Sequence, residues 1–388
     1  MALSPTTVQA DLTSLAAGWR EDRSERQARR HLEQDDFDAL REAGFLRLVA
    51  PEEAGGCWRS AGASARGVCE ALRMLAGADP SVALVASMHP AVVGFWLASS
   101  DPSQPAWERQ RASVFATAVA GDQWGTITSE PGSGGDMAKT RAVAERAPDL
   151  DAPVDGETYR VTGDKHFGSG SGVAAHMITT AVPEGEADPT IFVLDVRDRP
   201  WDGSAGLKLL AEWDGMGMAA TQSHAMRLEG APAVRLAWNG PLEEITVAAG
   251  PFTATLFTAV ILGVLDEAVS VARGQLQAKL DQLRAYEQVE WSRAEQDHWL
   301  AVQAYEGALR AIESGDQATA VHAALRAKEA VAGLAEQTLL RLTRVIGGGT
   351  FSRRSPFAHW FEDVRALGFL RPPWGLAYDT LLLTSFES

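Results

Sequence analysis

The sequence has few cysteines and fewer basic than acidic residues. The first argues against a disulfide-rich protein and the second against a nucleic-acid-binding protein. The chain of 388 residues has only two cysteines, Cys57 and Cys69, so a disulfide framework is not expected and a reducing cytoplasm fits. It carries 35 lysines and arginines against 51 aspartates and glutamates, a formal net charge of −16. This charge argues against nucleic acid as a partner, because a polyphosphate would be repelled. It does not exclude a local basic pocket for one nucleotide.

The sequence also lacks a secretory signal, a membrane span and a metal-binding pattern. Residues 1–21 contain no basic region followed by an apolar run. We expect no segment to reach the roughly 18 uncharged apolar residues that cross a bilayer, and the longest apolar run, Phe252 to Leu265, has the length of a buried helix. The eight histidines are scattered and the cysteines fit no zinc spacing. We therefore expect a cytoplasmic protein that binds neither a membrane nor a metal.

The patterning along the chain predicts an α+β protein of three domains. With 46% hydrophobic and 22% charged residues, the composition is that of a globular protein too long for one ordinary core. Residues 1–120 have the pattern of helices, and residues 121–242 that of short strands between Gly, Pro and Asp turns, which favours an antiparallel β-domain or barrel. Residues 243–388 return to helical periodicity and predict a four-helix-type bundle. The expected helices of the bundle are Phe252 to Leu280, Glu290 to Glu313 and Gln317 to Ile346.

The stretch Thr126 to Asp136 is the first candidate for a binding site. Thr126, Ile127, Thr128 and Ser129 alternate in the manner of a short half-buried strand. Pro131 and the glycines that follow, Gly134 and Gly135 among them, then break the strand and let the backbone come close to another group. A strand edge with hydroxyls that runs into a glycine turn offers N–H and O–H donors to a polar planar ring or a phosphate. The glycine spacing is not that of a dinucleotide fingerprint.

A second stretch, Gly163 to Gly172, again combines glycines and hydroxyls with one aromatic residue. Together the two stretches resemble the acyl-CoA dehydrogenase superfamily. Its members carry a "T-E-P-x-x-G-S-D" turn and a "G-x-K-x-W/F-I-T/S-N/G" strand, which hold the isoalloxazine ring of FAD between them. Residues 129–136, S-E-P-G-S-G-G-D, and residues 163–170, G-D-K-H-F-G-S-G, match in order and separation.

The resemblance implies a cofactor site shared between subunits, and hence a homotetramer or homodimer. Gly347 and Gly348 match a glycine segment that, in the superfamily, meets the FAD diphosphate of a neighbouring subunit, and Arg284 lies roughly where relatives place an arginine on the same cofactor. The implied cofactor is FAD, with reduced FMN or FADH2 from a reductase as the alternative. The implied cofactor-binding residues are Thr126, Thr128, Ser129, Gly134, Gly135, Phe167, Ser169, Arg284, Gly347 and Gly348.

The catalytic glutamate of the dehydrogenases has no counterpart in this sequence. Counting from Asp363 places Arg371 or Trp374 at the position of the glutamate, and neither side chain can serve as a carboxylate base. At the other position used by relatives, on the first bundle helix, the chain has Thr253. The catalytic residues are therefore unknown, and the candidates are Arg371, Trp374 and His89, the last on a helix that lies over the substrate end of the flavin in this superfamily.

Three functions are implied by the resemblance. The first is an FAD-dependent oxidoreductase that acts on an acyl-CoA or a similarly activated small substrate. The second is the two-component flavin monooxygenase branch, which uses reduced flavin and O2, also lacks the glutamate, and has a strand closer to Phe167-Gly168-Ser169-Gly170. The histidine that usually follows the helix end in that branch is missing after Asp363. The third is a non-catalytic relative that only binds flavin.

Overall fold

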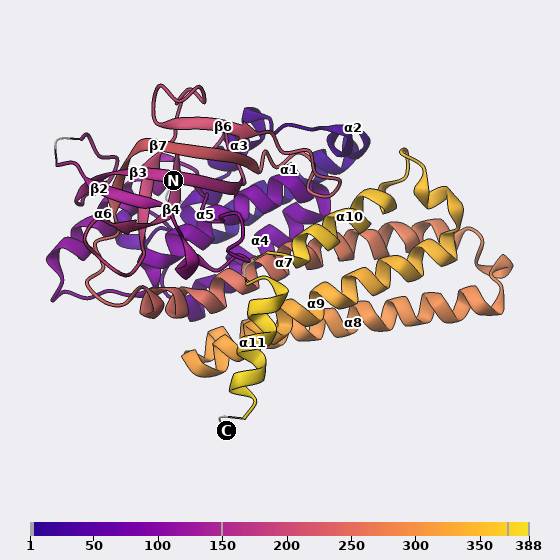
Figure 1. The fold of residues 1–388 in the computed structure, drawn as a ribbon. Helices are drawn as coiled ribbons and strands as arrows, with labels where there is room; N and C mark the ends of the chain where they lie inside the picture. Colours follow the sequence, from indigo (N-terminus) through magenta and orange to yellow (C-terminus); the bar gives the residue numbers. More distant parts are fainter. Residues whose placement is uncertain (1–3, 149, 371, 387–388) are drawn as a thin grey trace.

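The computed structural model describes residues 4–148, 150–370 and 372–386, in which helices and strands occupy separate parts of the chain (Figure 1). The mixed helical and strand class expected from the sequence is confirmed. A helical layer formed by the first part of the chain packs against both the strands and the later helices. The helices before the first strand are α1 (Pro5–Glu21), α2 (Arg23–Ala28), α3 (Gln34–Glu42), α4 (Ala61–Ala78), α5 (Pro80–Ala98) and α6 (Pro105–Ala120).

Helix α5 lies in the core of the protein. Its start is set by Asp79, whose carboxylate accepts a hydrogen bond from the N–H of Val82, and by Pro80 at the first helical position. The expectation that no segment reaches the length of a membrane span was wrong, because α5 carries no charged residue over its 19 positions. By length and composition α5 and the long helix α7 (Leu242–Gln277) are both apolar enough to cross a membrane, but 78% and 72% of their apolar windows are buried inside the protein. Both are core helices in this fold.

The middle of the chain forms a seven-stranded sheet. Strands β4, β2, β3, β7 and β5 pair in that order, and β5 pairs again with β4, so the pairings close into a barrel-like ring. The antiparallel arrangement expected for this part of the chain holds for the pairings of β2 with β3, of β3, β5 and β6 with β7, and of β4 with β5. The pairings of β1 with β4 and of β2 with β4 depart from it, because they are parallel. The strands are β1 (Trp124–Thr126), β2 (Val143–Arg146), β3 (Thr158–Gly168), β4 (His176–Pro183), β5 (Thr190–Asp195), β6 (Leu207–Ala211) and β7 (His224–Arg235).

The chain then returns to helices, which form an elongated bundle on the side away from the sheet (Figure 1). Helix α7 approaches α4 so closely that a Cβ on Gly263 would lie 2.0 Å from the carbonyl oxygen of Arg73, a contact that only glycine permits. The helices after α7 are α8 (Ala285–Ser314), α9 (Gln317–Ile346), α10 (Pro356–Gly368) and α11 (Trp374–Thr384).

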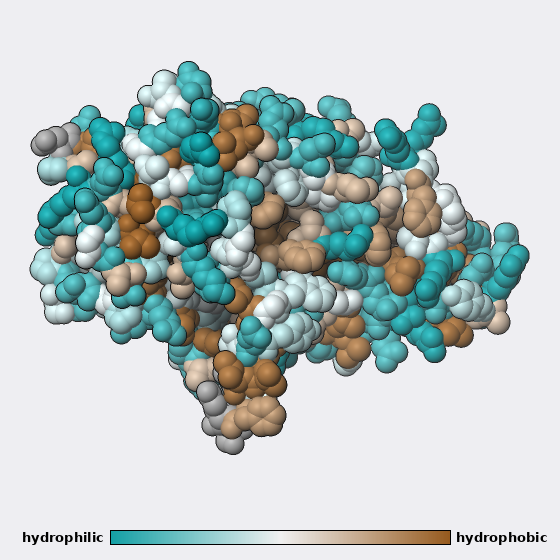
Figure 2. Space-filling model, viewed as in Figure 1, coloured by the Kyte–Doolittle hydropathy of each residue, from teal (hydrophilic) through white to brown (hydrophobic). Residues whose placement is uncertain are grey.

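Helix α11 projects from the bundle at the C-terminal end and exposes apolar side chains (Figure 2). Leu382 and Leu383 are 62% and 67% exposed, and Phe386 just beyond the helix is 83% exposed. Phe369, which lies between α10 and α11, is also exposed. An apolar projection of this kind is typical of a surface that another protein chain covers.

Candidate functional site

The two glycine- and hydroxyl-rich stretches lie side by side in the structure. Thr126 forms an antiparallel bridge with Ser169, and Ser129 forms one with His166. The N–H of His166 donates a 2.8 Å hydrogen bond to the carbonyl oxygen of Ser129. Residues that are about forty positions apart in the sequence are therefore neighbours on one backbone ledge, which we call the ring ledge (residues 126–129 and 166–169).

A buried ion pair joins the two halves of the ring ledge. Lys165 Nζ donates to Glu130 Oε1 at 2.6 Å and to the carbonyl oxygen of Thr180 at 2.6 Å. The other carboxylate oxygen of Glu130 accepts the N–H of Arg141 at 2.8 Å. Although burial opposes ionisation, Lys165 and these hydrogen-bond donors hold the pKa of Glu130 below its ordinary value. Glu130 is therefore a charged structural group at neutral pH.

The glycine turn after Glu130 connects the ring ledge with the C-terminal segment. Gly134 and Gly135 both have positive φ, at 63° and 84°, which favours glycine at these positions. A Cβ on Gly135 would lie 2.9 Å from the Pro373 ring, so the turn packs against the start of α11. The segment before α11 is in turn held by the buried Lys328, whose Nζ donates to the carbonyl oxygens of Gly368 at 2.8 Å and Pro372 at 2.9 Å.

Hydroxyl groups gather along the ring ledge. The Oγ1 atoms of Thr126 and Thr128 lie 3.4 Å apart on one face of the strand. Ser169 Oγ is 2.8 Å from Ser223 Oγ, which is 2.7 Å from Thr221 Oγ1. The sequence pattern placed Thr126, Thr128 and Ser169 in the site but did not indicate Thr221 and Ser223, which follow the turn at 216–220.

Phe167 presents its ring at the surface of the ring ledge. The side chain is 56% exposed, and its backbone has φ 57°, a conformation that is strained for any residue other than glycine. The ring contacts Trp213 edge to face, with centroids 6.0 Å apart. Trp213 is itself fixed, because its indole N–H donates to the carbonyl oxygen of Met218 at 2.8 Å. The strained backbone therefore holds an exposed aromatic ring beside the hydroxyl groups.

His89 is fully buried in α5, and both ring nitrogens are engaged by backbone groups. Nε2 lies 2.9 Å from the carbonyl oxygen of Leu46, and Nδ1 accepts the N–H of Trp124 at 3.2 Å. Burial lowers its pKa to about 4. A neutral imidazole with both nitrogens occupied links two backbone segments, and we assign it a structural role.

Of the positions considered for the glutamate, Trp374 lies at the start of α11. The indole N–H of Trp374 donates to the carbonyl oxygen of Gly368 at 2.6 Å, so this side chain helps to shape the segment. Arg371 lies outside the described residues. Thr253, at the alternative position for the base, is in α7 and half-buried.

The residues expected at the cofactor diphosphate do not meet the ring ledge within one chain. Arg284 is exposed and caps the start of α8, and Gly347 and Gly348 follow the end of α9. Both connections lie at the end of the bundle that points away from the sheet (Figure 1), where Leu283 and Val345 belong to one small apolar cluster. The structure thus brings Arg284 near these glycines but separates all three from Thr126, Thr128, Ser129, Gly134, Gly135, Phe167 and Ser169.

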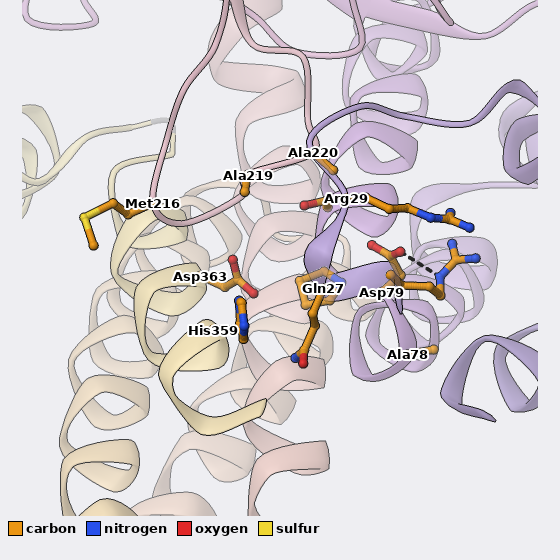
Figure 3. A pocket seen from close by; sticks show the side chains of 12 residues that line it. Gln27, Arg29, Ala78, Asp79, Met216, Ala219, Ala220, His359 and Asp363 are labelled. Atoms are coloured by element: carbon orange, nitrogen blue, oxygen red, sulfur yellow. Dashed lines mark hydrogen bonds and ion pairs between the residues drawn. The ribbon is translucent and has the colours of Figure 1, made fainter. Parts of the chain in front are cut away.

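A separate pocket lies between α2, the start of α5, the turn at 216–220 and α10 (Figure 3). It holds about 370 Å³ of empty space, counting its open mouth. His359 and Asp363 point into it from adjacent turns of α10. The N–H of Met218 donates to Asp363 Oδ1 at 2.7 Å, yet burial raises the pKa of this carboxyl to about 7. Asp79 on the opposite wall is held by Arg26 at 2.8 Å.

The partner of Asp363 is the turn at 216–220, which lies too far away along the chain for the sequence to reveal the contact. Among the described residues, no group of three or more histidine, cysteine, aspartate or glutamate side chains is placed to hold a metal ion.

Known proteins share this architecture. No family model matches the chain. The amino sugar nitrososynthase DnmZ of Streptomyces peucetius is 26% identical over 364 residues, which are 87% of this chain and 82% of that protein. FMN-bound TdsC from Paenibacillus sp. A11-2 superimposes with a TM-score of 0.80 at 21% identity, over 98% of this chain and 97% of the other. KijD3 in complex with FMN and a dTDP-linked 3-amino-4-keto sugar gives a TM-score of 0.81 at 20% identity, over 99% and 94%.

These matches show that the chain has the fold of the acyl-CoA dehydrogenase superfamily, in agreement with the resemblance carried by the two sequence stretches. The ring ledge fits a planar polar ring, because it offers hydroxyl and backbone donors along a strand edge and an exposed aromatic ring beside them. A flavin held there would be contacted by Thr126, Thr128 and Ser169, with Phe167 against its ring.

Proposed function

We propose that this protein is a flavin-dependent monooxygenase that receives reduced flavin from a separate reductase. One oxygen atom of O2 enters a small substrate and the other leaves as water, with both electrons drawn from the reduced flavin. The acyl-CoA dehydrogenase reaction, expected first from the sequence, becomes the second candidate.

The observation that carries this proposal is the missing carboxylate base, because Glu130, the carboxylate next to the ring ledge, belongs to the stretch shared with the dehydrogenases. A dehydrogenase needs a base with a raised pKa to remove an acidic proton from its substrate. Glu130 has a lowered pKa and is paired with buried Lys165, so its charge is already used in holding the ledge together. Thr253 and Trp374, at positions where relatives carry a glutamate, have no carboxyl group. Oxygenation of a nucleophilic substrate does not require such a base.

The flavin is proposed to bind with its ring on the ring ledge. Thr126, Thr128 and Ser169 would donate hydrogen bonds to the polar edge of the ring, and Phe167 would cover one face and exclude water. The strained φ of Phe167 supports this role, because strain of this kind persists at binding sites when the surrounding structure enforces it. The chemistry that the flavin supplies is the transfer of electrons and of one oxygen atom.

Whether the flavin is FAD or FMN depends on the contacts made with its phosphate groups, at the end of the cofactor away from the ring. FAD would need a contact for its diphosphate, which we assign to Gly347, Gly348 and Arg284 of a neighbouring copy, whereas FMN would need only the ring ledge and a nearby phosphate contact. The FMN-bound relatives support FMN as the first flavin to test. A homodimer or homotetramer formed partly through the apolar side chains of α11 would bring such copies together.

For the substrate we propose an amine, and a nucleotide-linked amino sugar is the first compound to assay. The support is the similarity to an amino sugar nitrososynthase over most of the chain and to KijD3 with a dTDP-linked amino sugar. An acidic protein can still hold such a ligand through a local cluster of arginines, although its net charge of −16 slows the approach of an anion.

The proposal is tested by comparing two half-reactions on the purified protein. In the first, protein with reduced FMN and a dTDP-linked amino sugar is exposed to O2, and the oxidised amine is measured by mass spectrometry. In the second, protein with oxidised flavin is mixed anaerobically with a panel of acyl-CoA thioesters, and bleaching of the flavin is followed. We expect product only in the first. Bleaching at an ordinary dehydrogenase rate would establish the second candidate instead, and flavin binding without either reaction would indicate a non-catalytic relative.

A further inference from the structure

Four tryptophans form an unbroken row from strand β1 to the surface. Trp124 on β1 is two residues before Thr126 and, by strand alternation, on the same side of the strand. Its ring lies 5.5 Å from that of Trp96 on α5, which lies 6.3 Å from Trp107 on α6. Trp107 in turn lies 5.5 Å from Trp238, between β7 and α7. All these distances join ring centroids.

The two ends of the row differ in their access to solvent. Trp124, Trp96 and Trp107 are fully buried. Trp238 is half-buried and lines a surface crevice together with Arg109 and Asn239. The row therefore begins inside the protein, on the strand that leads into the ring ledge, and ends where a small molecule from solution can reach it.

The groups around the indoles favour electron transfer from ring to ring, because they do not take the N–H proton of an oxidised indole and so do not fix the radical on one ring. The indole N–H of Trp124 donates to Thr117 Oγ1 at 3.0 Å, that of Trp96 to Gln110 Oε1 at 3.2 Å, and that of Trp107 to the carbonyl oxygen of Ser99 at 3.2 Å. A hydroxyl, an amide and a backbone carbonyl are poor bases. An indole that has lost one electron would therefore keep its proton and be reduced readily by the next ring.

Packing alone does not require indoles at these four positions. Leucine or phenylalanine fills a buried core equally well and leaves no N–H that needs a partner. The chain contains twelve tryptophans and only four tyrosines, and it places four of the twelve in this one row. Of the side chains that pack in cores, tryptophan is among the most easily oxidised by one electron.

We propose that Trp124, Trp96, Trp107 and Trp238 form a one-electron relay between the flavin and the crevice at Trp238. This inference rests on the proposed flavin site. The oxidant is the light-excited oxidised flavin, and the final reductant is a small thiol in solution. Each excitation moves one electron from Trp124 to the flavin. The oxidised Trp124 is then reduced by Trp96, Trp96 by Trp107, and Trp107 by Trp238, which takes an electron from the thiol. Two flavins that have each gained one electron then exchange an electron, and one of them takes up two protons from water and is fully reduced while the other returns to the oxidised state. In the same balance one dithiol loses two electrons and two protons and closes to its cyclic disulfide.

The relay is tested by anaerobic blue-light reduction of the flavin-loaded protein with dithiothreitol in solution. Wild type, Trp107→Phe and Trp238→Phe are compared with Trp299→Phe, which changes an exposed indole on α8 outside the row. Trp238→Phe is included because its position at the rim keeps the fold intact if the buried variant unfolds. Flavin affinity and thermal unfolding are measured for each variant before illumination, and a dark sample gives the direct reaction of the thiol with flavin.

The proposal predicts that Trp107→Phe and Trp238→Phe slow photoreduction by an order of magnitude and remove a long-lived tryptophan radical from the transient absorption spectrum. Flavin affinity and the Trp299→Phe control stay at wild-type values. Equal photoreduction rates in all four proteins would overturn the relay while leaving the flavin site standing. Failure of wild-type protein to bind any flavin would instead overturn the proposed function, and the relay with it.

Discussion

Lys165 Nζ lies 2.6 Å from Glu130 Oε1, and neither side chain is appreciably exposed to solvent. This ion pair ties the strand that carries Phe167 and Ser169 to the strand that carries Thr126 and Thr128. The geometry of the ring ledge therefore depends on this charge pair.

Replacing one partner of this pair should both destabilise the protein and weaken flavin binding. Lys165→Met leaves the Glu130 carboxylate buried without its partner, which costs about 3–5 kcal/mol in comparable cases. Urea unfolding gives the stability and a flavin titration gives the affinity. Arg146→Ala is the control, because it breaks an ion pair with Glu157 whose side chains are 64% and 54% exposed, and such pairs contribute about 1 kcal/mol or less. An equal loss in both variants would contradict the role assigned to Lys165.

Ser169 is predicted to form a hydrogen bond with the flavin directly. Ser169→Ala removes one hydroxyl from the ring ledge and should weaken flavin binding by about 2- to 12-fold, the equivalent of one neutral hydrogen bond at about 0.5–1.5 kcal/mol. Thr162→Ala is the matched control, since Thr162 lies in β3, which ends just before Ser169, but its Oγ1 accepts the N–H of Gly230. Fluorescence titration with FMN measures both. Equal affinities for the Ser169 variant and wild type would place the ring elsewhere.

A substitution at Gly348 should affect the binding of FAD and FMN differently. Among the described residues, none has an atom within 4 Å of a Cβ built on Gly348, so Gly348→Leu is tolerated by a single chain. If this backbone meets the FAD diphosphate of a neighbouring copy, the variant should lose FAD affinity and keep FMN affinity. Gly333→Leu, at a similarly open position on α9, is the control. Light scattering establishes the oligomer, and a monomer that binds FAD as tightly as FMN would contradict the shared site.

Asp363 should make stability depend on pH. Burial, together with the nearby charges of Asp79 and Glu362, raises its pKa to about 7 against the effect of the Met218 N–H. Because an unfolded aspartate titrates near about 3.9, the unfolded chain loses this proton first, and stability falls as the pH rises from about 4 to about 7. Asp363→Asn keeps an oxygen for the Met218 N–H and should remove this fall. Thermal unfolding at pH 5 and pH 8 measures it, with the exposed Asp379→Asn as control. Parallel pH profiles for wild type and Asp363→Asn would show that Asp363 is not protonated in the fold.

The sequence predicted the positions of the long helices well and those of the short strands less well. The expected helix Gln317 to Ile346 coincides with α9, because its apolar periodicity runs unbroken from the Asp316 cap to Gly347. Strands β2 and β6 were not expected, since Val143–Arg146 and Leu207–Ala211 are short and lack alternation. The two parallel pairings of β4 join segments that are far apart along the chain and leave no mark in local sequence.

Some residues of the candidate site could likewise be predicted from the sequence, and others could not. The residues of the ring ledge could be picked out because they belong to two recognisable stretches that the fold brings together. The contact of Ser169 with Ser223, the capture of Met218 by Asp363 and the row of tryptophans depend on packing between distant segments. The burial of His89 against Leu46 and Trp124 likewise depends on how α5 meets the first strand, which helical periodicity cannot report.

The most direct test of monooxygenase activity is rapid mixing of protein and reduced FMN with oxygenated buffer, with and without a dTDP-linked amino sugar. We predict that oxidation of the flavin is coupled to oxidation of the amine, with one product molecule formed per flavin and little hydrogen peroxide released. Hydrogen peroxide in equal amounts with and without the amine and with every other amine tested, together with flavin bleaching by an acyl-CoA under anaerobic conditions, would contradict the proposed function.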